Sequence, residues 1–70
     1  MNYSNFKIRF YNDILLTYPN AQLDDNAITI TSGHLEISIS LREAYSALEL
    51  TCDYDITIER FLKNIADYKN

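Results

Sequence analysis

The chain has 70 residues, of which 47% are apolar, and its ten acidic residues outnumber six Lys and Arg, giving a net charge of −4 at pH 7. One Gly and one Pro exclude a disordered tail or linker, so we expect a single globular domain over residues 1–70. We read no signal-peptide pattern and no apolar run long enough to cross a membrane. Cys52 is the only cysteine, which excludes an intrachain disulfide and favours a reducing, cytoplasmic location.

The first predicted element is a helix over residues 5–18. Its apolar residues recur at steps of three and four, as they do on the buried stripe of a helix. They are Phe6, Phe10, Tyr11, Ile14, Leu15 and Tyr18. Ser4 or Asn5 is expected to cap this helix, and Pro19 to end it.

A β-hairpin is the clearest prediction for the middle of the chain. Two runs that alternate apolar and polar residues, Ala27–Thr31 and Leu35–Ser40, flank the turn sequence Ser32-Gly33-His34. The apolar residues of both runs share one face and are Ile28, Ile30, Leu35, Ile37 and Ile39. Before the hairpin, turn clusters at Pro19-Asn20 and Asp24-Asp25-Asn26 surround a short extended piece that could add an edge strand.

Two helices are predicted after the hairpin. Ser40-Leu41-Arg42-Glu43 has the Ser-x-x-Glu spacing of a capping box, which marks the start of the first. Its apolar face contains Leu41, Ala44, Tyr45 and Leu48. A second stripe predicts a helix that Asp55 caps and that runs to about Tyr68. That stripe contains Ile58, Phe61, Leu62, Ile65 and Tyr68.

The segment between these helices has two interpretations, because residues 48–59 also alternate strictly between apolar and polar. We favour a helix junction in which Thr51-Cys52-Asp53-Tyr54 is a short connection. The alternative is a strand over residues 47–54 that pairs with the hairpin. Both give an α+β fold, with an N-terminal helix, an antiparallel hairpin with or without a third strand, and two C-terminal helices packed on one sheet face.

Charge is the main indication of function. Between Asp24 and Glu59 there are eight acids against Arg42 alone, and the last five acids of this segment have no base among them. Those five, the predicted partner-binding residues, are Glu43, Glu49, Asp53, Asp55 and Glu59. Their field would repel nucleic acid and attract a basic protein surface. The competing interpretation is that they only confer solubility and cap a helix.

No pattern predicts a metal, a cofactor or catalysis. Asp53-x-Asp55-x-Thr57 is similar to the start of a calcium loop, but Ile58 replaces the required Gly and Asn64 the bidentate Glu. One His, His34, and one Cys, Cys52, cannot complete a four-ligand zinc site within one chain. No motif positions either of them as a nucleophile or base. We therefore expect a protein that is not an enzyme.

Direct binding to nucleic acid is not expected either. Lys7 and Arg9 alternate with Phe6 and Phe10, as basic and aromatic residues do on platforms for single-stranded nucleic acid. On a helix, however, both Phe residues belong to the core stripe and are not free to stack on bases.

In size, acidity and lack of catalytic residues, the chain resembles small phage-encoded inhibitors of host defence, among them anti-CRISPR and anti-restriction proteins. The resemblance is one of class and rests on no shared motif. It implies a nucleic-acid mimic that inhibits a larger nucleic-acid-handling protein by occupying its basic groove. The alternative is a structural or regulatory module that self-associates, for instance as a homodimer, through its Tyr-rich helices or through the free edge of the hairpin.

Overall fold

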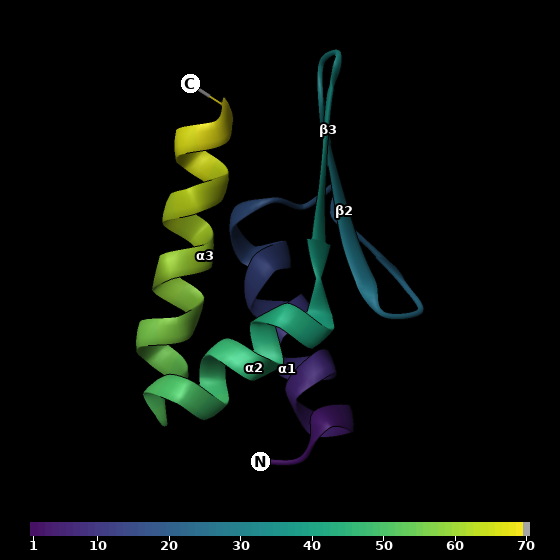
Figure 1. Cartoon of the computed structure of the whole chain (residues 1–70). Helices are drawn as coiled ribbons and strands as arrows, with labels where there is room; N and C mark the ends of the chain where they lie inside the picture. The colour runs from purple at the N-terminus through teal and green to yellow at the C-terminus, as the bar shows by residue number, and fades with distance from the viewer. Residues whose placement is uncertain (70) are drawn as a thin grey trace.

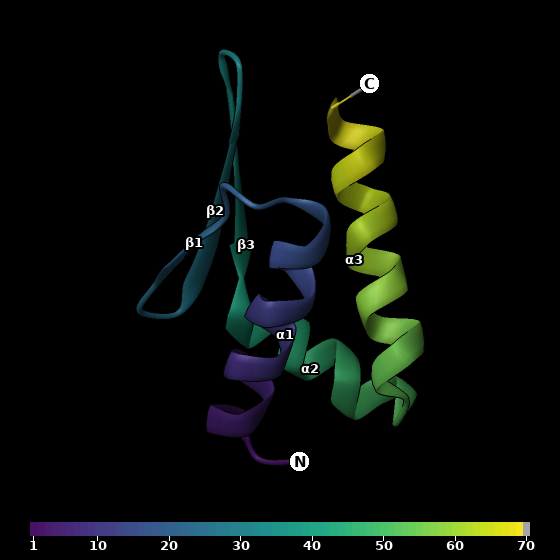
Figure 2. The same cartoon turned by 180° about the vertical axis from the view of Figure 1, so that it is seen from behind.

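The fold is α+β, as predicted, with three helices on one face of a three-stranded sheet (Figure 1). The computed structural model describes residues 1–69, with the elements α1 (Tyr3–Thr17), β1 (Gln22–Asp24), β2 (Ala27–Ser32), β3 (Leu35–Ser40), α2 (Leu41–Thr51) and α3 (Tyr54–Lys69). The antiparallel sheet has the strand order β1-β2-β3. α1 and α3 run along the sheet, and α2 crosses between β3 and α3 at one end (Figure 2).

The predicted stripe of α1 is confirmed, but the predicted caps are wrong. Phe6, Phe10 and Ile14 are fully buried. The helix begins at Tyr3, because the Asn2 side chain accepts a hydrogen bond from the Asn5 N–H at 2.8 Å and so caps the first turn. The cap therefore lies two to three residues before the predicted Ser4 or Asn5.

The hairpin and the additional edge strand are both present. β1 pairs with β2 through a turn at Asp25, and β2 pairs with β3 through a turn at Gly33. Gly33 has φ +61°, a conformation that glycine adopts without strain. The predicted inward face is confirmed for Ile28, Ile30 and Ile39, which are buried, but Leu35 beside the hairpin turn is 39% exposed, so its assignment to the buried face was wrong. The far end of the hairpin extends past the helices, which leaves the sheet edge open there (Figure 1).

The junction between α2 and α3 decides between the two interpretations of residues 48–59. Residues 47–51 belong to α2, so the alternative strand over residues 47–54 is wrong. Cys52 takes a left-handed conformation with φ +55° and ends the helix. Asp53, rather than the predicted Asp55, caps α3, because its Oδ1 accepts a hydrogen bond from the Ile56 N–H at 3.1 Å.

Thr57 shows why the alternation in this segment is accidental. The pattern assigns it to the polar side, yet its side chain is only 1% exposed. Its hydroxyl donates to the Asp53 carbonyl oxygen at 2.8 Å and lies 2.9 Å from the Thr51 hydroxyl. These bonds satisfy the buried group and tie the end of α2 to the first turn of α3.

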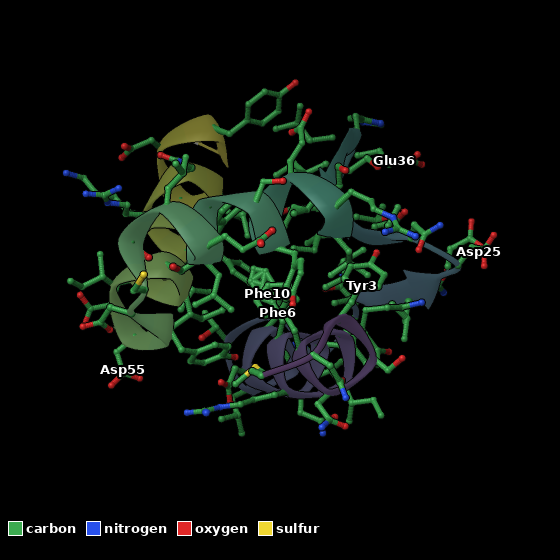
Figure 3. The ribbon with its side chains drawn as sticks, turned by 60° about the horizontal axis from the view of Figure 1, so that its bottom comes forward. Tyr3, Phe6, Phe10, Asp25, Glu36 and Asp55 are labelled. Atoms are coloured by element: carbon green, nitrogen blue, oxygen red, sulfur yellow. The ribbon has the colours of Figure 1, made fainter. Side chains whose placement is uncertain are left out.

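The core is organised around aromatic rings of α1. The ring of Phe6 lies 5.1 Å from that of Phe10, 5.3 Å from Tyr45 of α2 and 6.2 Å from Tyr54 of α3. Figure 3 shows Phe6 and Phe10 in the interior of the molecule. At the other end of α3, Tyr68 is 63% exposed, so its assignment to the buried stripe was wrong. The ring contacts therefore fix the first half of α3 more firmly than its last turn.

A polar contact adds to this packing between α1 and α3. The Tyr54 hydroxyl donates to Asp13 Oδ2 at 2.6 Å, and the Arg9 guanidinium lies 3.9 Å from the centre of the Tyr54 ring. Burial, and next the hydrogen bond to Asp13, raises the pKa of Tyr54 above its ordinary value. The phenol is therefore neutral and donates its proton at physiological pH.

Tyr54→Phe is expected to lower the free energy of unfolding by about 1 kcal/mol at pH 7, because the Asp13 carboxylate loses its donor. Because the pKa of Tyr54 is raised in the folded protein, the stability from the neutral phenol is fully present below the ordinary phenol pKa. It is lost as the pH rises through the pKa of the folded state. The difference in free energy of unfolding between the unaltered chain and the Tyr54→Phe variant should therefore narrow above about pH 10. Urea unfolding measures both effects, and equal stability of the two proteins at pH 7 would contradict the role of this bond.

Candidate protein-binding surface

All five predicted partner-binding acids lie on the surface. The side chains of Glu43, Glu49, Asp53, Asp55 and Glu59 are exposed. They are presented by α2, by the junction and by the first two turns of α3. Within the part of the chain that the structure describes, no carboxylate lies in a salt bridge with a Lys or Arg, so none of these acids is paired with a base.

Four of these acids belong to the end of α2, the connection and the first two turns of α3, and are here called the junction acids: Glu49, Asp53, Asp55 and Glu59. Asp53 is the cap of α3, and Asp55 lies in its first turn, where the helix dipole stabilises negative charge. Glu59 follows Asp55 by four residues, which places both on one side of α3. The Glu49 and Glu59 side chains accept no hydrogen bond from residues 1–68, so they have no evident structural role.

Glu43 lies apart from the junction acids, on a groove between β3 and α3. This β3–α3 groove has a volume of about 280 Å³ and is lined by Glu36, Ile37, Ser38, Ile39, Ser40, Glu43, Phe61, Asn64, Ile65 and Tyr68. Two acids and no Lys or Arg belong to this lining. Figure 3 shows Glu36 and Asp55 on opposite sides of the molecule, so the acids form more than one surface.

The groove runs along a free edge of the sheet, because β3 is the last strand in the order β1-β2-β3. The Leu41 N–H donates to the Asn26 carbonyl oxygen at 2.8 Å at the end of the β2–β3 ladder. Hydrogen-bonded and non-hydrogen-bonded pairs alternate along such a ladder. Because Leu41 and Asn26 form a hydrogen-bonded pair, Ile39 and Ile37 of β3 also bond to β2. Ser38 and Glu36 belong to the pairs in between, so their main-chain N–H and C=O groups point away from β2, toward the open edge.

The cations of α1 and α2 contact aromatic rings. Arg42, the only base within the acidic middle of the chain, lies 4.3 Å from the centre of the Tyr3 ring, and Lys7 lies 5.6 Å from it. Arg9 contacts Tyr54 in the same way. These cation–π contacts give the three bases a structural role, which the sequence pattern did not indicate.

Other candidate chemistry finds little support in the arrangement of side chains. Among the described residues, no group of three or more His, Cys, Asp and Glu could hold a metal ion. His34 lies at the tip of the hairpin and Cys52 at the helix junction, at opposite ends of the molecule (Figure 1). None of the helices within residues 1–69 has both the length and the apolar character needed to cross a membrane.

Comparison of the chain with family models, with curated proteins and with solved structures gives no match. An α+β arrangement by itself does not indicate a function, since one fold can carry many unrelated sites. Function is therefore inferred from the surface itself.

Sequence reasoning identified the exposed acids and the free hairpin edge but missed the groove. The lining residues come from β3, α2 and α3, and the apolar ones belong to stripes that predict only a buried core. The exposure of Tyr68 at the end of α3, where it lines the groove, depends on the position of α3 beside β3 and has no signal in the sequence.

Replacement of Asp53 tests whether this acid stabilises the junction. Asp53→Ala should lower the free energy of unfolding by about 1 kcal/mol, because the Ile56 N–H loses its acceptor. Asp53→Asn should lower the free energy of unfolding much less than Asp53→Ala does, since Asn caps helices as well as Asp does. Thermal unfolding followed by circular dichroism measures both, and equal losses for the two variants would show that Asp53 does not act as a cap.

Proposed function

We propose that this chain is a non-catalytic protein-binding protein that presents its acids to the basic surface of a larger, nucleic-acid-handling protein and inhibits it. One observation carries the proposal. The five acids from Glu43 to Glu59 are exposed, and in the described part of the chain none of them forms a salt bridge with a base. A basic groove that normally holds phosphates is the protein surface that best complements such a field.

The position of the junction acids on helix ends supports this proposal. A single exposed ion pair contributes only about 0.2–1 kcal/mol, so the acids would have to act as a group. Asp53 is held by its hydrogen bond to the Ile56 N–H, and Asp55 and Glu59 project from the regular turns of α3. The Asp53 charge is therefore already positioned and loses less side-chain freedom on binding, whereas the helix fixes only the main chain of Asp55 and Glu59.

Complementary charge also accelerates encounter with the partner. Long-range attraction raises association rates and weakens as salt screens it. Arg9 contacts the ring of Tyr54 at the junction, and Arg60 and Lys63 follow Glu59 on α3, so some positive charge lies beside the junction acids. The segment from Glu43 to Glu59 is nonetheless strongly negative, because it holds five acids and no base.

Self-association is the alternative, and the open edge of β3 is the feature that favours it, because two such edges could pair. The tyrosines of α1 give less support to self-association, because their hydroxyls are already used within the chain. Tyr3 donates to Asn26 Oδ1 at 2.9 Å and Tyr11 to the Ala21 carbonyl oxygen at 3.0 Å, so both hydroxyls serve internal contacts. Sedimentation over a range of concentrations distinguishes a dimer from a monomer.

The test compares two variants with the same net charge. One carries Glu49→Gln, Asp55→Asn and Glu59→Gln, and leaves the Asp53 cap in place. The control carries Asp24→Asn, Asp25→Asn and Asp67→Asn, which neutralise three acids outside the junction. Both changes remove three negative charges, so a difference between the variants reports the position of the charge.

Each tagged variant, and the unaltered chain, is incubated with lysate of the source cell and washed at about 0.1 M and then about 1 M salt, which shortens the Debye length from about 10 Å to about 3 Å. We expect the unaltered chain and the control to retain a nucleic-acid-handling protein at low salt and release it at high salt. The junction variant should retain at least about tenfold less, since charge complementarity is lost. Equal retention by all three proteins, or no such protein on any of them, would refute the proposal.

A further inference from the structure

We infer that the β3–α3 groove binds an extended segment of a partner protein, which adds to the free edge of β3 as an antiparallel fourth strand with alternating basic and apolar side chains. The inference rests on the proposed protein-binding function and names the partner's structural element. Of the five predicted partner-binding acids, only Glu43 lines this groove, so the groove is a different surface from the junction acids.

The main chain of β3 supplies the first part of the argument. Glu36 and Ser38 direct N–H and C=O groups toward the open edge, where strand addition would satisfy them. Natural edge strands are commonly protected by charged side chains, especially Lys, by Pro or by a bulge, and β3, with the sequence LEISIS, has neither Lys nor Pro and carries one charge, Glu36. Neighbouring α3 cannot pair with this edge, because the main-chain groups of a helix bond to one another.

The floor of the groove selects apolar side chains on one face of the added strand. Ile37 and Ile39 share the face that β3 turns toward the helices. A strand beside β3 would direct alternate side chains toward Phe61, Ile65 and Tyr68 of α3, which line the opposite wall. Tyr68 is 63% exposed and would lose much of that exposure under such a strand.

The acids select basic side chains on the other face. Glu36 lies on β3 with its side chain exposed, and a residue of the added strand would lie directly opposite it. Glu43 lines the same groove from α2, on the helix side of the sheet, and adds to the negative field there, since the lining contains no base. Lys or Arg opposite Glu36 would be favourable, whereas an acid there would be repelled.

Two other occupants fit less well. A small molecule held in the groove of about 280 Å³ would leave the outward main-chain groups of Glu36 and Ser38 unpaired, whereas a strand would pair them. β3 of a second copy could pair with this edge, but its sequence LEISIS contains no Lys or Arg, so it offers no basic side chain to complement Glu36.

The test uses a fluorescent seven-residue peptide of alternating lysine and valine, and its binding to the intact chain is followed by anisotropy. In antiparallel pairing, the residues opposite Glu36 and Ser38 exchange main-chain hydrogen bonds with them, and these are the lysines. A peptide with N-methyl groups on the backbone nitrogens of two inner lysines should therefore bind at least about tenfold more weakly. The matched peptide with N-methyl groups on two valines should bind as the parent does, because those nitrogens face away from β3.

Protein variants test the charge selection. Glu36→Gln together with Glu43→Gln should weaken binding of the parent peptide at low salt by at least about tenfold. Asp24→Asn together with Asp25→Asn, which changes the net charge equally at the far edge of the sheet, should leave binding unchanged. Circular dichroism verifies that all proteins are folded.

Three results would overturn the inference: no binding of the parent peptide, equal binding of all three peptides, or a loss confined to the valine-methylated peptide. A dimer of the chain that the peptide does not dissociate would also overturn it, in favour of a second copy as the occupant. None of these results affects the comparison of the junction variants, so failure of the groove and failure of the proposed function are distinguishable.

Discussion

The buried ring of Phe6 connects all three helices, since it contacts Phe10 within α1, Tyr45 of α2 and Tyr54 of α3. A chain of 70 residues buries only about 60% of its unfolded surface, so it has few such contacts. The loss of a buried Phe costs about 3–5 kcal/mol, which approaches the whole stability of many small domains. The position of α3 beside β3, and with it the groove and the placement of the junction acids, depends on this packing.

Periodicity predicted much of this fold because a helix stripe and a strand face are local properties. The stripe of α1, the inward isoleucines of the hairpin and the Ser40 cap of α2 all follow from spacing within a few residues. The caps at Asn2 and Asp53 were missed because several capping residues lie close together in both places, and only the path of the chain selects one.

The candidate site was predictable only in part. Exposure of the acids followed from their charge, but the arrangement of those charges depended on contacts between distant residues. Arg42 contacts Tyr3 across 39 positions of sequence, and Tyr54 bonds to Asp13 across 41. The groove likewise requires β3 and α3 to be placed side by side by the core. Such tertiary relations leave no periodic signal in one sequence.

In the function proposed here, the two surfaces would give complementary means of recognition. The junction acids would supply long-range attraction that does not depend on the partner's main chain, whereas the edge of β3 would supply short-range hydrogen bonds with a defined register. A partner with a basic surface and an exposed strand-forming segment would satisfy both. An open edge that no partner covers would instead be a liability, because free edges promote aggregation.

Amide hydrogen exchange resolved by NMR tests the central claim, that the edge of β3 is open to a partner strand, most directly. In the free protein, the Glu36 and Ser38 amides should exchange much faster than those of Ile37 and Ile39, which bond to β2. Addition of the lysine–valine peptide should slow the Glu36 and Ser38 amides specifically. Slow exchange of these two amides in the free protein, or no change on addition of the peptide, would contradict the account.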